Sequence, residues 1–566
     1  MKGEWKAGTT RTLKLSETSS SWNYTITATD PSAAAYDQTT TDNYGITSYR
    51  TASDGTQQAV AWKVVGYDAD GDGTFSMAEK PAWLTSLSKT EGDGGTAADQ
   101  GTATLKKAEM IDLLAKRNKE LKDATALGST SNPYDLSTKG GTENRSTANS
   151  YVISAPGVYR IPLVYGNAIK NGNDNPSSYK TSNTGTYILS NFQDHAGHPI
   201  TDPWIEKTHG GANNGVDGAE VVWADAADLV HLSSTPIKHA GANNDAFLEF
   251  EVKASDIQSG NAVVAVKKGG TIVWSWHLWF APQDALSTIA VTNHQGKVYN
   301  FTKETLGWKP TQWSGSTYDK PRTVKVKVEQ TVANNGTKQV SEFTITQNPG
   351  NVRKGIATLY QFGRKDAFPG VDASKLAAGS HFTENAGDNM SIQNGIQNPG
   401  SFYTWGGSWI NTPPTGYSYY NLWSADNTVT GFNDNSVVKT VYDPCPVGFK
   451  MPASNAFTGF TTTGQNSFTQ SEFNVDGTSD WQTFQSNFGH NFWTSSSKTA
   501  TINFPASGFR SPSVGSLGNV GIGGYYWSAV PYSTNYGCLL NFGSDNVNPP
   551  DVNNRTHGFA SRPVSE

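Results

Sequence analysis

Apolar residues recur at helical spacing in one long segment of this chain, whereas the other periodic segments alternate like β-strands. The helical segment runs from Leu105 to about Ala124, with acids and bases between its apolar positions. In SWNYTITATD, by contrast, Trp22, Tyr24 and Ile26 alternate with polar residues and would share one face of a strand. This balance of patterns predicts a mostly β protein.

The composition agrees with many short strands joined by turns. Of the 566 residues, 16% are charged, 11% are aromatic and 57 are glycine. Strands favour aromatic and β-branched residues, and turns favour glycine and asparagine. Because a single core stops growing near roughly 250–300 residues, a chain of this length is expected to form about three or four domains.

The net charge of −6 argues against nucleic acid or an anionic membrane as the partner. Neither polyanion attracts a mildly acidic protein without a local basic cluster, and the sequence contains none. No run of about 18 apolar residues predicts a transmembrane segment, and the start, MKGEWKAGTT, lacks the apolar stretch of a leader. The composition is typical of exported proteins, so we expect an extracellular chain whose leader is absent here.

Changes of pattern along the chain predict four regions. Residues 1–124 are expected to form an N-terminal β-sandwich domain with a trailing helix. Residues 125–149 are rich in Ser, Thr, Asn and Gly and predict a linker. Residues 150–350 predict a second β-sandwich, which includes the strands RTVKVKVEQ and SEFTITQ around an Asn-Gly turn. Residues 351–566, rich in Gly, Asn, Ser and aromatics, predict a separate domain with long irregular loops around a small sheet.

A strand in the second sandwich carries three tryptophans, Trp274, Trp276 and Trp279, in the stretch TIVWSWHLWF. Two interpretations are open. The rings could form a platform on which sugars stack, or they could belong to the core. A strand that is apolar on both faces is usually sandwiched between layers, so the core interpretation is favoured.

Several motifs in the last third resemble a known family. The motifs YDPCPVGFKMPASNAF (Tyr442 to Phe457), FPASGFR, GYYWSAVPYS and NRTHGFASRPV resemble the C-terminal C-type-lectin-like domain of surface proteins from Bacteroides-type bacteria. LYQFGRKDAFPG (Leu359 to Gly370) resembles the entry of that domain. The fold class implied is two N-terminal β-sandwich domains followed by a C-type-lectin-like α+β domain.

The upstream sequence is similar to the sandwich regions of fimbrillin-like tip pilins and related adhesins. The segments that carry this resemblance are SYVISAPGVYRIPLVYGNAIKNG and VAVKKGGTIVWSWHLWFAP. The resemblance implies an exported protein at the cell surface or fimbrial tip, often lipid-anchored, with fimbrial shaft subunits among its partners. In some relatives the last strands are diversified by retroelements, so ligand choice differs between copies.

The ligand-binding residues are expected in the last forty positions, where polar side chains accompany β-strands. Trp527 and Phe542 are interpreted as core anchors, with polar neighbours exposed. Amide and phenol groups bond sugars or peptide backbones without strong charge, although such residues are also common in solvated turns. The predicted contact residues are Tyr532, Asn535, Tyr536, Asn541, Ser544, Asn546, Asn553, Asn554 and His557.

A calcium-bridged sugar site is not expected in this domain. Lectins of this fold that bind sugar through calcium use carboxylate and amide pairs around a proline, followed by a Trp-Asn-Asp run. Asn548-Pro549-Pro550-Asp551 is only a loose echo of that pattern.

A calcium loop is nevertheless predicted near the N-terminus, in DADGDGTFSMAE. This segment matches the twelve-residue EF-hand loop, with Gly73 at the turn. The flanking residues predict a strand before the loop, and Lys80-Pro81 interrupts a helix after it, so an acidic hairpin loop without metal is the alternative. The expected ligands of a structural calcium are Asp68, Asp70, Asp72, Thr74 (carbonyl), Ser76 and Glu79.

Catalysis has little support in the sequence, and the function expected is non-enzymatic. No HExxH, GxSxG or P-loop string occurs. Asp194, His195 and His198 in DHAGH could hold a metal or form a surface turn, and the turn is favoured. A single disulfide between the two cysteines, Cys445 and Cys538, could not by itself stabilise a chain this long, and the sequence leaves open whether they pair.

Together these patterns predict a cell-surface adhesin or fimbrial tip subunit that binds a host or bacterial surface glycan or protein. Two alternatives remain at this point. One is a secreted carbohydrate-active enzyme, because the carboxylate pair of glycoside hydrolysis is defined by its separation in space. The other is a freely displayed carbohydrate-binding lipoprotein with no role in a pilus.

Overall fold

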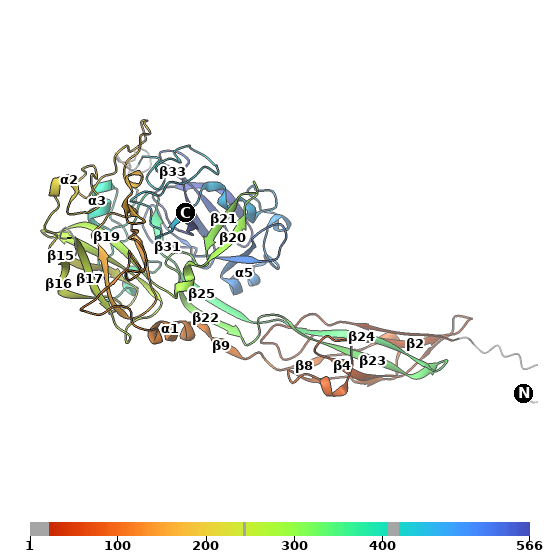
Figure 1. Cartoon of the computed structure of the whole chain (residues 1–566). Helices are drawn as coiled ribbons and strands as arrows, with labels where there is room; N and C mark the ends of the chain where they lie inside the picture. Colours follow the sequence, from red (N-terminus) through yellow and green to blue (C-terminus); the bar gives the residue numbers. More distant parts are fainter. Residues whose placement is uncertain (1–21, 241–244, 406–417) are drawn as a thin grey trace, which may run out of the picture. The chain divides into compact units, whose positions relative to one another are not determined.

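The chain is mostly β, as predicted, and divides into two compact units (Figure 1). The computed structural model describes residues 22–240, 245–405 and 418–566. Unit 1 consists of Met1–Ile111 with Ser314–Asn351, and unit 2 consists of Asp112–Trp313 with Val352–Glu566. The chain therefore leaves unit 1 and returns to it before it completes unit 2.

Unit 1 contains two antiparallel four-stranded sheets that share one core. The first has the order β1-β2-β3, with β7 also paired to β2, and the second has the order β24-β23-β4-β6. Tyr44 of the first sheet stacks on Phe343 of the second with ring centroids 4.5 Å apart. The bounds are β1 Asn23–Thr29, β2 Tyr44–Thr51, β3 Gln57–Ala59, β4 Trp62–Asp68, β6 Glu91–Gly92, β7 Gly95–Gly101, β23 Arg322–Asn334, β24 Thr337–Gln347, and a separate pair of β5 Leu84–Leu87 and β8 Ala103–Leu105.

The hairpin of β23 and β24 belongs to unit 1, whereas its sequence pattern was assigned to a second sandwich formed by residues 150–350. In Figure 1 these green strands lie beside the orange β4. The register places Val326 opposite Tyr67 and Val328 opposite Val64. The buried valines of β23 belong to the same hydrophobic core as Tyr44 and Trp62 of the N-terminal strands.

The first part of unit 2 contains two further four-stranded sheets, in the orders β10-β12-β17-β16 and β11-β19-β18-β15. Strands β18 and β19 form an antiparallel hairpin, in which Gly260 pairs with Phe280. Residues 125–149, predicted as a linker, contribute β10 and the buried Asp135, which pairs with Arg145 and Arg160. The bounds are β10 Tyr134–Asp135, β11 Ser150–Ile153, β12 Gly157–Pro162, β15 Gly218–Ala224, β16 His231–His239, β17 Ala246–Val252, β18 Gly260–Lys268 and β19 Thr271–Phe280.

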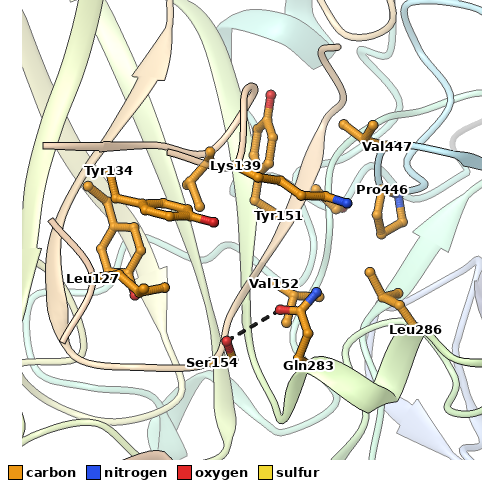
Figure 2. Close-up of a pocket in the computed structure, with 13 residues that line it drawn as sticks. Leu127, Tyr134, Lys139, Tyr151, Val152, Ser154, Gln283, Leu286, Pro446 and Val447 are labelled. Atoms are coloured by element: carbon orange, nitrogen blue, oxygen red, sulfur yellow. Dashed lines mark hydrogen bonds between the residues drawn. The ribbon is translucent and has the colours of Figure 1, made fainter. Parts of the chain in front are cut away.

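A cavity of about 390 Å³ opens beside β10 and β11 (Figure 2). Its wall is mainly apolar and includes the rings of Tyr134, Tyr151 and Tyr159. The charged group in the lining, Lys139, pairs with Glu143 outside it. The cavity is suited to an apolar group, and no carboxylate lines it.

The predicted helix exists but is shorter than its sequence pattern. Helix α1 spans Leu113–Asp123, whereas Met110–Asp112 forms strand β9. Asp112 ends the strand and caps the helix, because its side chain accepts a hydrogen bond of 2.8 Å from Ala115 N. The apolar residues before Asp112 that continue the helical spacing therefore lie in extended chain.

The last third of the chain forms a seven-stranded sheet in the order β31-β30-β35-β32-β33-β34, with β26 also paired to β35. Strands β32, β33 and β34 are antiparallel neighbours, and β34 is an edge strand. Val547 at the start of β34 also exchanges two backbone bonds of 3.0 Å with Ser467, and every residue of β34 is buried or half-buried. The bounds are β26 Leu359–Gln361, β30 Phe509–Arg510, β31 Leu517–Gly518, β32 Gly524–Pro531, β33 Tyr536–Phe542, β34 Val547–Asn554 and β35 Gly558–Ala560.

Shorter elements connect these sheets. Strands β9 Met110–Asp112, β22 Lys309–Ser316 and β25 Asn351–Ile356 stand where the chain passes between the units. The remaining strands are β13 Ile169–Lys170, β14 Asn173–Asp174, β20 Thr288–Thr292, β21 Val298–Thr302, β27 Phe449–Lys450, β28 Gly489–Trp493, β29 Thr501–Pro505 and β36 Val564–Ser565. The helices are α2 Thr208–Gly211, α3 Ile392–Gln397 and α5 Trp481–Asn487, with 3₁₀ turns η1 Met77–Glu79, η2 Pro176–Ser178, η4 Gln283–Leu286, η5 Ala373–Lys375, η6 Ser454–Phe460 and η7 Gln470–Glu472.

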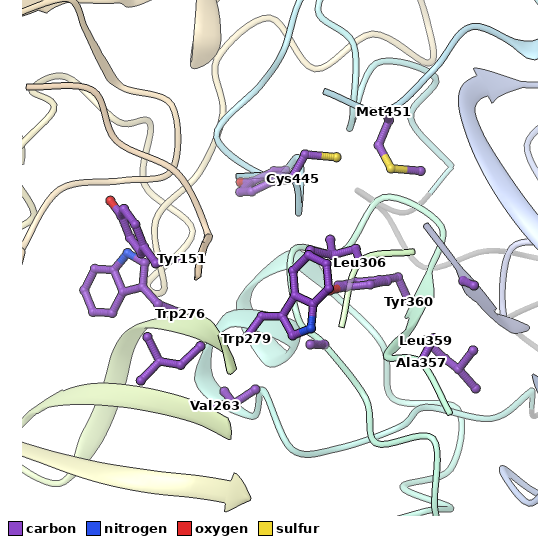
Figure 3. Packing of buried hydrophobic residues seen from close by; sticks show 14 of the residues in the cluster. Tyr151, Val263, Trp276, Trp279, Leu306, Ala357, Leu359, Tyr360, Cys445 and Met451 are labelled. Carbon is purple, nitrogen blue, oxygen red and sulfur yellow. The ribbon is translucent and has the colours of Figure 1, made fainter. Parts of the chain in front are cut away.

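Residues on both sides of position 350 share one hydrophobic core in unit 2 (Figure 3). Trp274, Trp276 and Trp279 are fully buried in it, which confirms the core interpretation of these rings. Figure 3 shows Trp279 close to Tyr360, from the predicted entry of the third domain. The predicted second and third domains are therefore packed as one unit.

Buried polar contacts join the same two regions. Asn149 Nδ2 donates to Val441 O at 2.7 Å and to Asp443 O at 2.8 Å. In the GRKD segment, Asp366 pairs with Lys365 at 2.6 Å and accepts a bond from Ser275 Oγ of β19 at 3.2 Å. Because buried polar groups are costly unless bonded, these contacts hold the two regions in register.

Among the described residues, no helix is both long and apolar enough to cross a membrane. The two cysteines, Cys445 and Cys538, are buried and do not form a disulfide with each other. The stability of unit 2 therefore rests on packing and on its buried polar contacts.

Candidate recognition surface and metal-binding clusters

The hairpin between β32 and β33 presents two tyrosines to solvent. Tyr532 is 45% exposed and Tyr536 is 38% exposed. The backbone between them is closed by bonds from Tyr532 N at 2.9 Å and Ser533 N at 3.0 Å to Tyr536 O. Asn535 O accepts a bond of 3.0 Å from Arg555 N, so the tip is fastened to the chain that follows β34. The two rings stand on a fixed turn.

The structure divides most of the nine predicted contact residues between the two ends of β33. Asn553 and Asn554 pair with Gly537 and Tyr536, next to the exposed hairpin tip. Ser544 and Asn546 lie in the turn beyond the other end, and a seven-residue strand spans roughly 20 Å. The nine residues therefore do not form one contact surface. We name as the tyrosine end the group Tyr532, Asn535, Tyr536, Asn553 and Asn554.

Two of the predicted contact residues are engaged within the fold. Asn541 Nδ2 donates to Asp551 Oδ2 across the β33–β34 pair at 3.0 Å. His557 packs against Phe509 and Phe559, with ring centroids 5.7 and 4.9 Å apart. Burial lowers the pKa of His557 to about 4, so its ring is neutral near pH 7.

An exposed phenylalanine that the sequence analysis did not select lies beside the tyrosine end. Phe432 is 41% exposed, and its ring centroid is 6.0 Å from that of Tyr532. Phe432 also lines an open hollow of about 440 Å³. The residues around this hollow are mostly polar and uncharged: Gln295, Phe432, Asn455, Thr458, Gly464, Gln465, Asn466 and Pro550. Only the folded chain brings these positions together, which is why no local signal could identify them.

Beneath this surface the sheet is firmly anchored. Trp527 and Phe542 are buried, as predicted, and Trp527 Nε1 donates to Tyr360 O at 2.9 Å. Phe362 packs edge-on against Trp527 with ring centroids 5.4 Å apart. The exposed rings are thus carried by a closely packed core, an arrangement that limits the entropy lost when a ligand binds.

The predicted calcium loop is folded around its first aspartate. Asp68 is buried at the end of β4, and its carboxylate accepts bonds from Gly71 N at 2.6 Å and Gly73 N at 3.1 Å. The predicted strand before the loop is present, and the single turn η1 follows it. Ligand oxygens of Asp68, Asp70 and Glu79 all lie within 4.8 Å of one another.

Two other predicted ligands, Asp72 and Ser76, accept hydrogen bonds from backbone N–H groups of the loop. Asp72 Oδ1 accepts a bond of 2.6 Å from Thr74 N, and Ser76 Oγ accepts a bond of 3.1 Å from Ala78 N. Glu79 Oε2 is shielded from solvent and makes no hydrogen bond. Desolvation and the neighbouring aspartates raise the pKa of Glu79. A divalent cation would relieve this repulsion, so the donor set fits calcium.

The DHAGH segment forms part of a second cluster, although with a different third member. Ligand atoms of Asp194, His198 and His209 lie within 4.8 Å of one another. His195, the expected partner, is outside this group. His209 stands in the short α2 segment, eleven positions after His198, where no metal-site spacing signals it.

Residues 464–564 match the model of a domain of unknown function, DUF8237. This stretch contains all nine predicted contact residues as well as strands β28 to β35. No curated protein and no solved structure matches the chain.

Proposed function

We propose that this protein is a non-enzymatic adhesin or fimbrial tip subunit that binds a glycan or protein ligand at the tyrosine end of unit 2. The observation that carries the proposal is the group of exposed rings, Phe432, Tyr532 and Tyr536, beside a hollow lined by amide side chains. A cluster of exposed aromatic side chains on a protein surface often marks a recognition site, whereas single exposed apolar residues are common and need no function.

The chemistry of this surface suits uncharged ligands. Aromatic faces pack against the apolar faces of sugar rings or against side chains, and phenol groups add hydrogen bonds. Asn455, Gln465 and Asn466 supply both donors and acceptors around the hollow. Such groups bond sugar hydroxyls and peptide backbones equally well, so a glycan and a protein surface are both suitable ligands.

Surface location and fimbrial assembly rest on the resemblance of the sequence to tip pilins and to C-type-lectin-like domains. Co-purification with fimbrial shafts from the source bacterium distinguishes a tip subunit from a freely displayed lipoprotein. A protein that never co-purifies with shafts would keep the binding function but lose the fimbrial role.

A carbohydrate-active enzyme would need a different arrangement. Glycoside hydrolysis uses two carboxylates roughly 5–10 Å apart that face one cleft. Neither the hollow beside Phe432 nor the cavity beside β10 is lined by Asp or Glu. At these two places the lining favours recognition over hydrolysis.

The test is a glycan and surface-protein array probed with the full chain. We expect a specific ligand, and we expect the double variant Tyr532→Ala/Tyr536→Ala to bind it at least about tenfold more weakly, because central aromatic contacts are each worth about 1–3 kcal/mol. Trp481→Ala is the matched control, since Trp481 is an exposed ring on α5. Equal binding by the double variant and the native chain would overturn the assignment of this surface.

A second function is carried by an independent observation in unit 1. We propose that the loop Asp68–Glu79 binds calcium in a structural role. The convergence of three carboxylates within 4.8 Å, one of them with a shielded and unbonded oxygen, supports this assignment. The loop follows β4 directly, so bound calcium would fix the end of a core strand.

A further inference from the structure

We propose that Asp194, His198 and His209 form a binding site for a divalent transition metal, with zinc as the preferred ion. One ligand atom of each residue lies within 4.8 Å of the other two. Two imidazole nitrogens and one carboxylate oxygen are a donor set that zinc commonly uses. The site lies in unit 2 and is separate in both position and donor chemistry from the all-oxygen loop of unit 1.

The charge of Asp194 is the first independent argument. Asp194 is fully buried, and its three hydrogen bonds come from uncharged donors: Ala196 N and His198 N at 2.9 Å to Oδ1, and Asn213 Nδ2 at 3.1 Å to Oδ2. No Lys or Arg of the described residues forms an ion pair with Asp194, and Lys207 pairs with Asp245. A buried carboxylate without a cation is costly, and a metal ion would supply the missing positive charge.

The hydrogen bonds of Asp194 also leave room for a metal. An ionised carboxylate has about four lone-pair positions, and three are occupied by the donors named above. Oδ1 accepts two of these bonds and Oδ2 accepts one. One lone pair on Oδ2 therefore remains for a metal ion.

His209 provides the second argument. Its Nε2 is shielded from solvent, yet it has no hydrogen-bond partner among the described residues. Its backbone has φ of 55°, a left-handed conformation that is uncommon for residues other than glycine. The fold thus holds a strained residue with an unused ring nitrogen beside a buried carboxylate, and strain of this kind is concentrated at functional sites.

The third ligand connects the site to solvent. His198 is exposed, and its ring centroid lies 4.8 Å from that of His209 at an interplanar angle of 59°. This approach brings one ligand nitrogen of each ring within 4.8 Å of the other and of an Asp194 oxygen. Three protein ligands with one side open leave a coordination position for water or for a donor from a partner molecule.

Imidazole nitrogens distinguish this site from a calcium or magnesium site. Those hard cations prefer oxygen ligands, whereas zinc and its neighbours in the first transition row bind imidazole well. The ligand spacing, four residues from Asp194 to His198 and then a distant His209, lacks the regular pattern of sequence motifs. The fold creates this site by bringing α2 against the DHAGH turn.

The experiment is a calorimetric titration of the chelator-treated full chain with zinc, with calcium in excess to fill oxygen-only sites. We expect one zinc ion per chain at this site, with affinity that falls at least about tenfold in His198→Gln and in His209→Asn. Asparagine tolerates the left-handed backbone at position 209, so the second variant removes the ring without adding strain. Cobalt titration provides a second measurement, because its visible absorption reports the ligand geometry.

Two control variants test whether the zinc ligands are the residues that the fold brings together or the histidine that is next to Asp194 in the sequence. His195→Gln changes the histidine next to Asp194 that lies outside the cluster, and His231→Gln changes one that pairs with Asp256 elsewhere. Both are expected to bind zinc like the native chain. Loss of binding in His195→Gln with retention in His209→Asn would overturn the proposed ligand set, and so would the absence of zinc binding by the native chain.

Discussion

Arg117 and Glu304 form a bidentate ion pair inside unit 2, with Nη1 to Oε1 at 2.6 Å and Nη2 to Oε2 at 2.8 Å. The side chains are only 5% and 8% exposed. Arg117 Nε also donates to Ser259 Oγ at 3.0 Å. Because Arg117 stands on α1, the pair fixes this helix to chain segments more than a hundred residues away.

Removal of one partner is expected to destabilise unit 2 strongly. Arg117→Ala leaves the buried carboxylate of Glu304 without its hydrogen-bonded ion-pair partner, so the free energy of unfolding should fall by about 3–5 kcal/mol. Lys119→Ala on the same helix removes an exposed pair with Asp123 and should cost less than about 1 kcal/mol. Urea unfolding followed by tryptophan fluorescence measures both. Equal small losses in the two variants would show that the buried pair is not a structural anchor.

Local elements of the fold could be predicted from the sequence because their signals are local. The β23–β24 hairpin has alternating valines and a turn at Asn335-Gly336, whose φ values of 49° and 81° are the positive angles that such turns require. Helix α1 begins later than the predicted segment, which starts at Leu105, because Asp112 caps the helix inside that segment.

The grouping of strands could not be predicted in the same way. Strand β23 pairs with β4 across about two hundred and sixty positions, and nothing in either strand specifies that partner. A boundary near residue 350 follows the change of composition, but the buried side chains of Trp279 and Tyr360 belong to one core. Composition distinguishes loop-rich segments from strand-rich segments. Membership of a core depends instead on which faces of the strands pack together in the fold.

The candidate sites show the same limit. Residue type and position correctly placed Tyr532 and Tyr536 at an exposed strand end, because a short polar loop between strands is normally a hairpin tip. Phe432 and His209 were missed, since each joins its site from a distant part of the chain. Asn541 and His557 were selected for their chemistry, but the fold uses both in internal contacts.

Acid is expected to destabilise unit 2 through buried neutral histidines. Burial lowers the pKa of His490 from 6.5 to about 4, and its Nε2 donates to Gly543 O at 2.9 Å. Between these two pKa values the unfolded chain binds a proton that the folded chain does not, so stability is lost as the pH falls through this window. The loss approaches about 1.4 kcal/mol per pH unit for one histidine.

The variant His490→Gln isolates this contribution, because glutamine keeps a hydrogen-bond donor but does not titrate. We expect its unfolding free energy to depend less steeply on pH than that of the native chain between pH 6.5 and 4. Urea unfolding at several pH values gives the two slopes. Parallel pH profiles for the variant and the native chain would contradict a buried, neutral His490.

The two thiols are expected to resist modification in the folded protein. Cys445 and Cys538 are fully buried, and burial raises the pKa of the Cys538 thiol to about 12 and that of Cys445 well above its usual range. Thiol reagents react with the thiolate, so labelling should require opening of the core. Ellman's reagent should modify two thiols in urea and none promptly without it.

A positive control for this measurement is Ser544→Cys, which places a thiol in the partly exposed turn after β33. This cysteine should react promptly in the folded chain. Prompt labelling of the native protein at a comparable rate would show that the core around Cys538 opens far more readily than its packing implies.

Calcium is expected to raise the melting temperature of unit 1 through the loop Asp68–Glu79. A ligand that binds only the folded state stabilises it by RT ln(1 + [L]/Kd), and the loop gathers three carboxylates within 4.8 Å. The double variant Asp70→Asn/Glu79→Gln should lose this calcium response. In chelator it should melt no lower than the native chain, because the repulsion that raises the pKa of Glu79 is also removed.

The control variant is Asp54→Asn, in another turn of the same unit, which should respond to calcium like the native chain. Scanning calorimetry with and without calcium distinguishes these outcomes, and identical native melting curves in both conditions would exclude calcium binding at this loop.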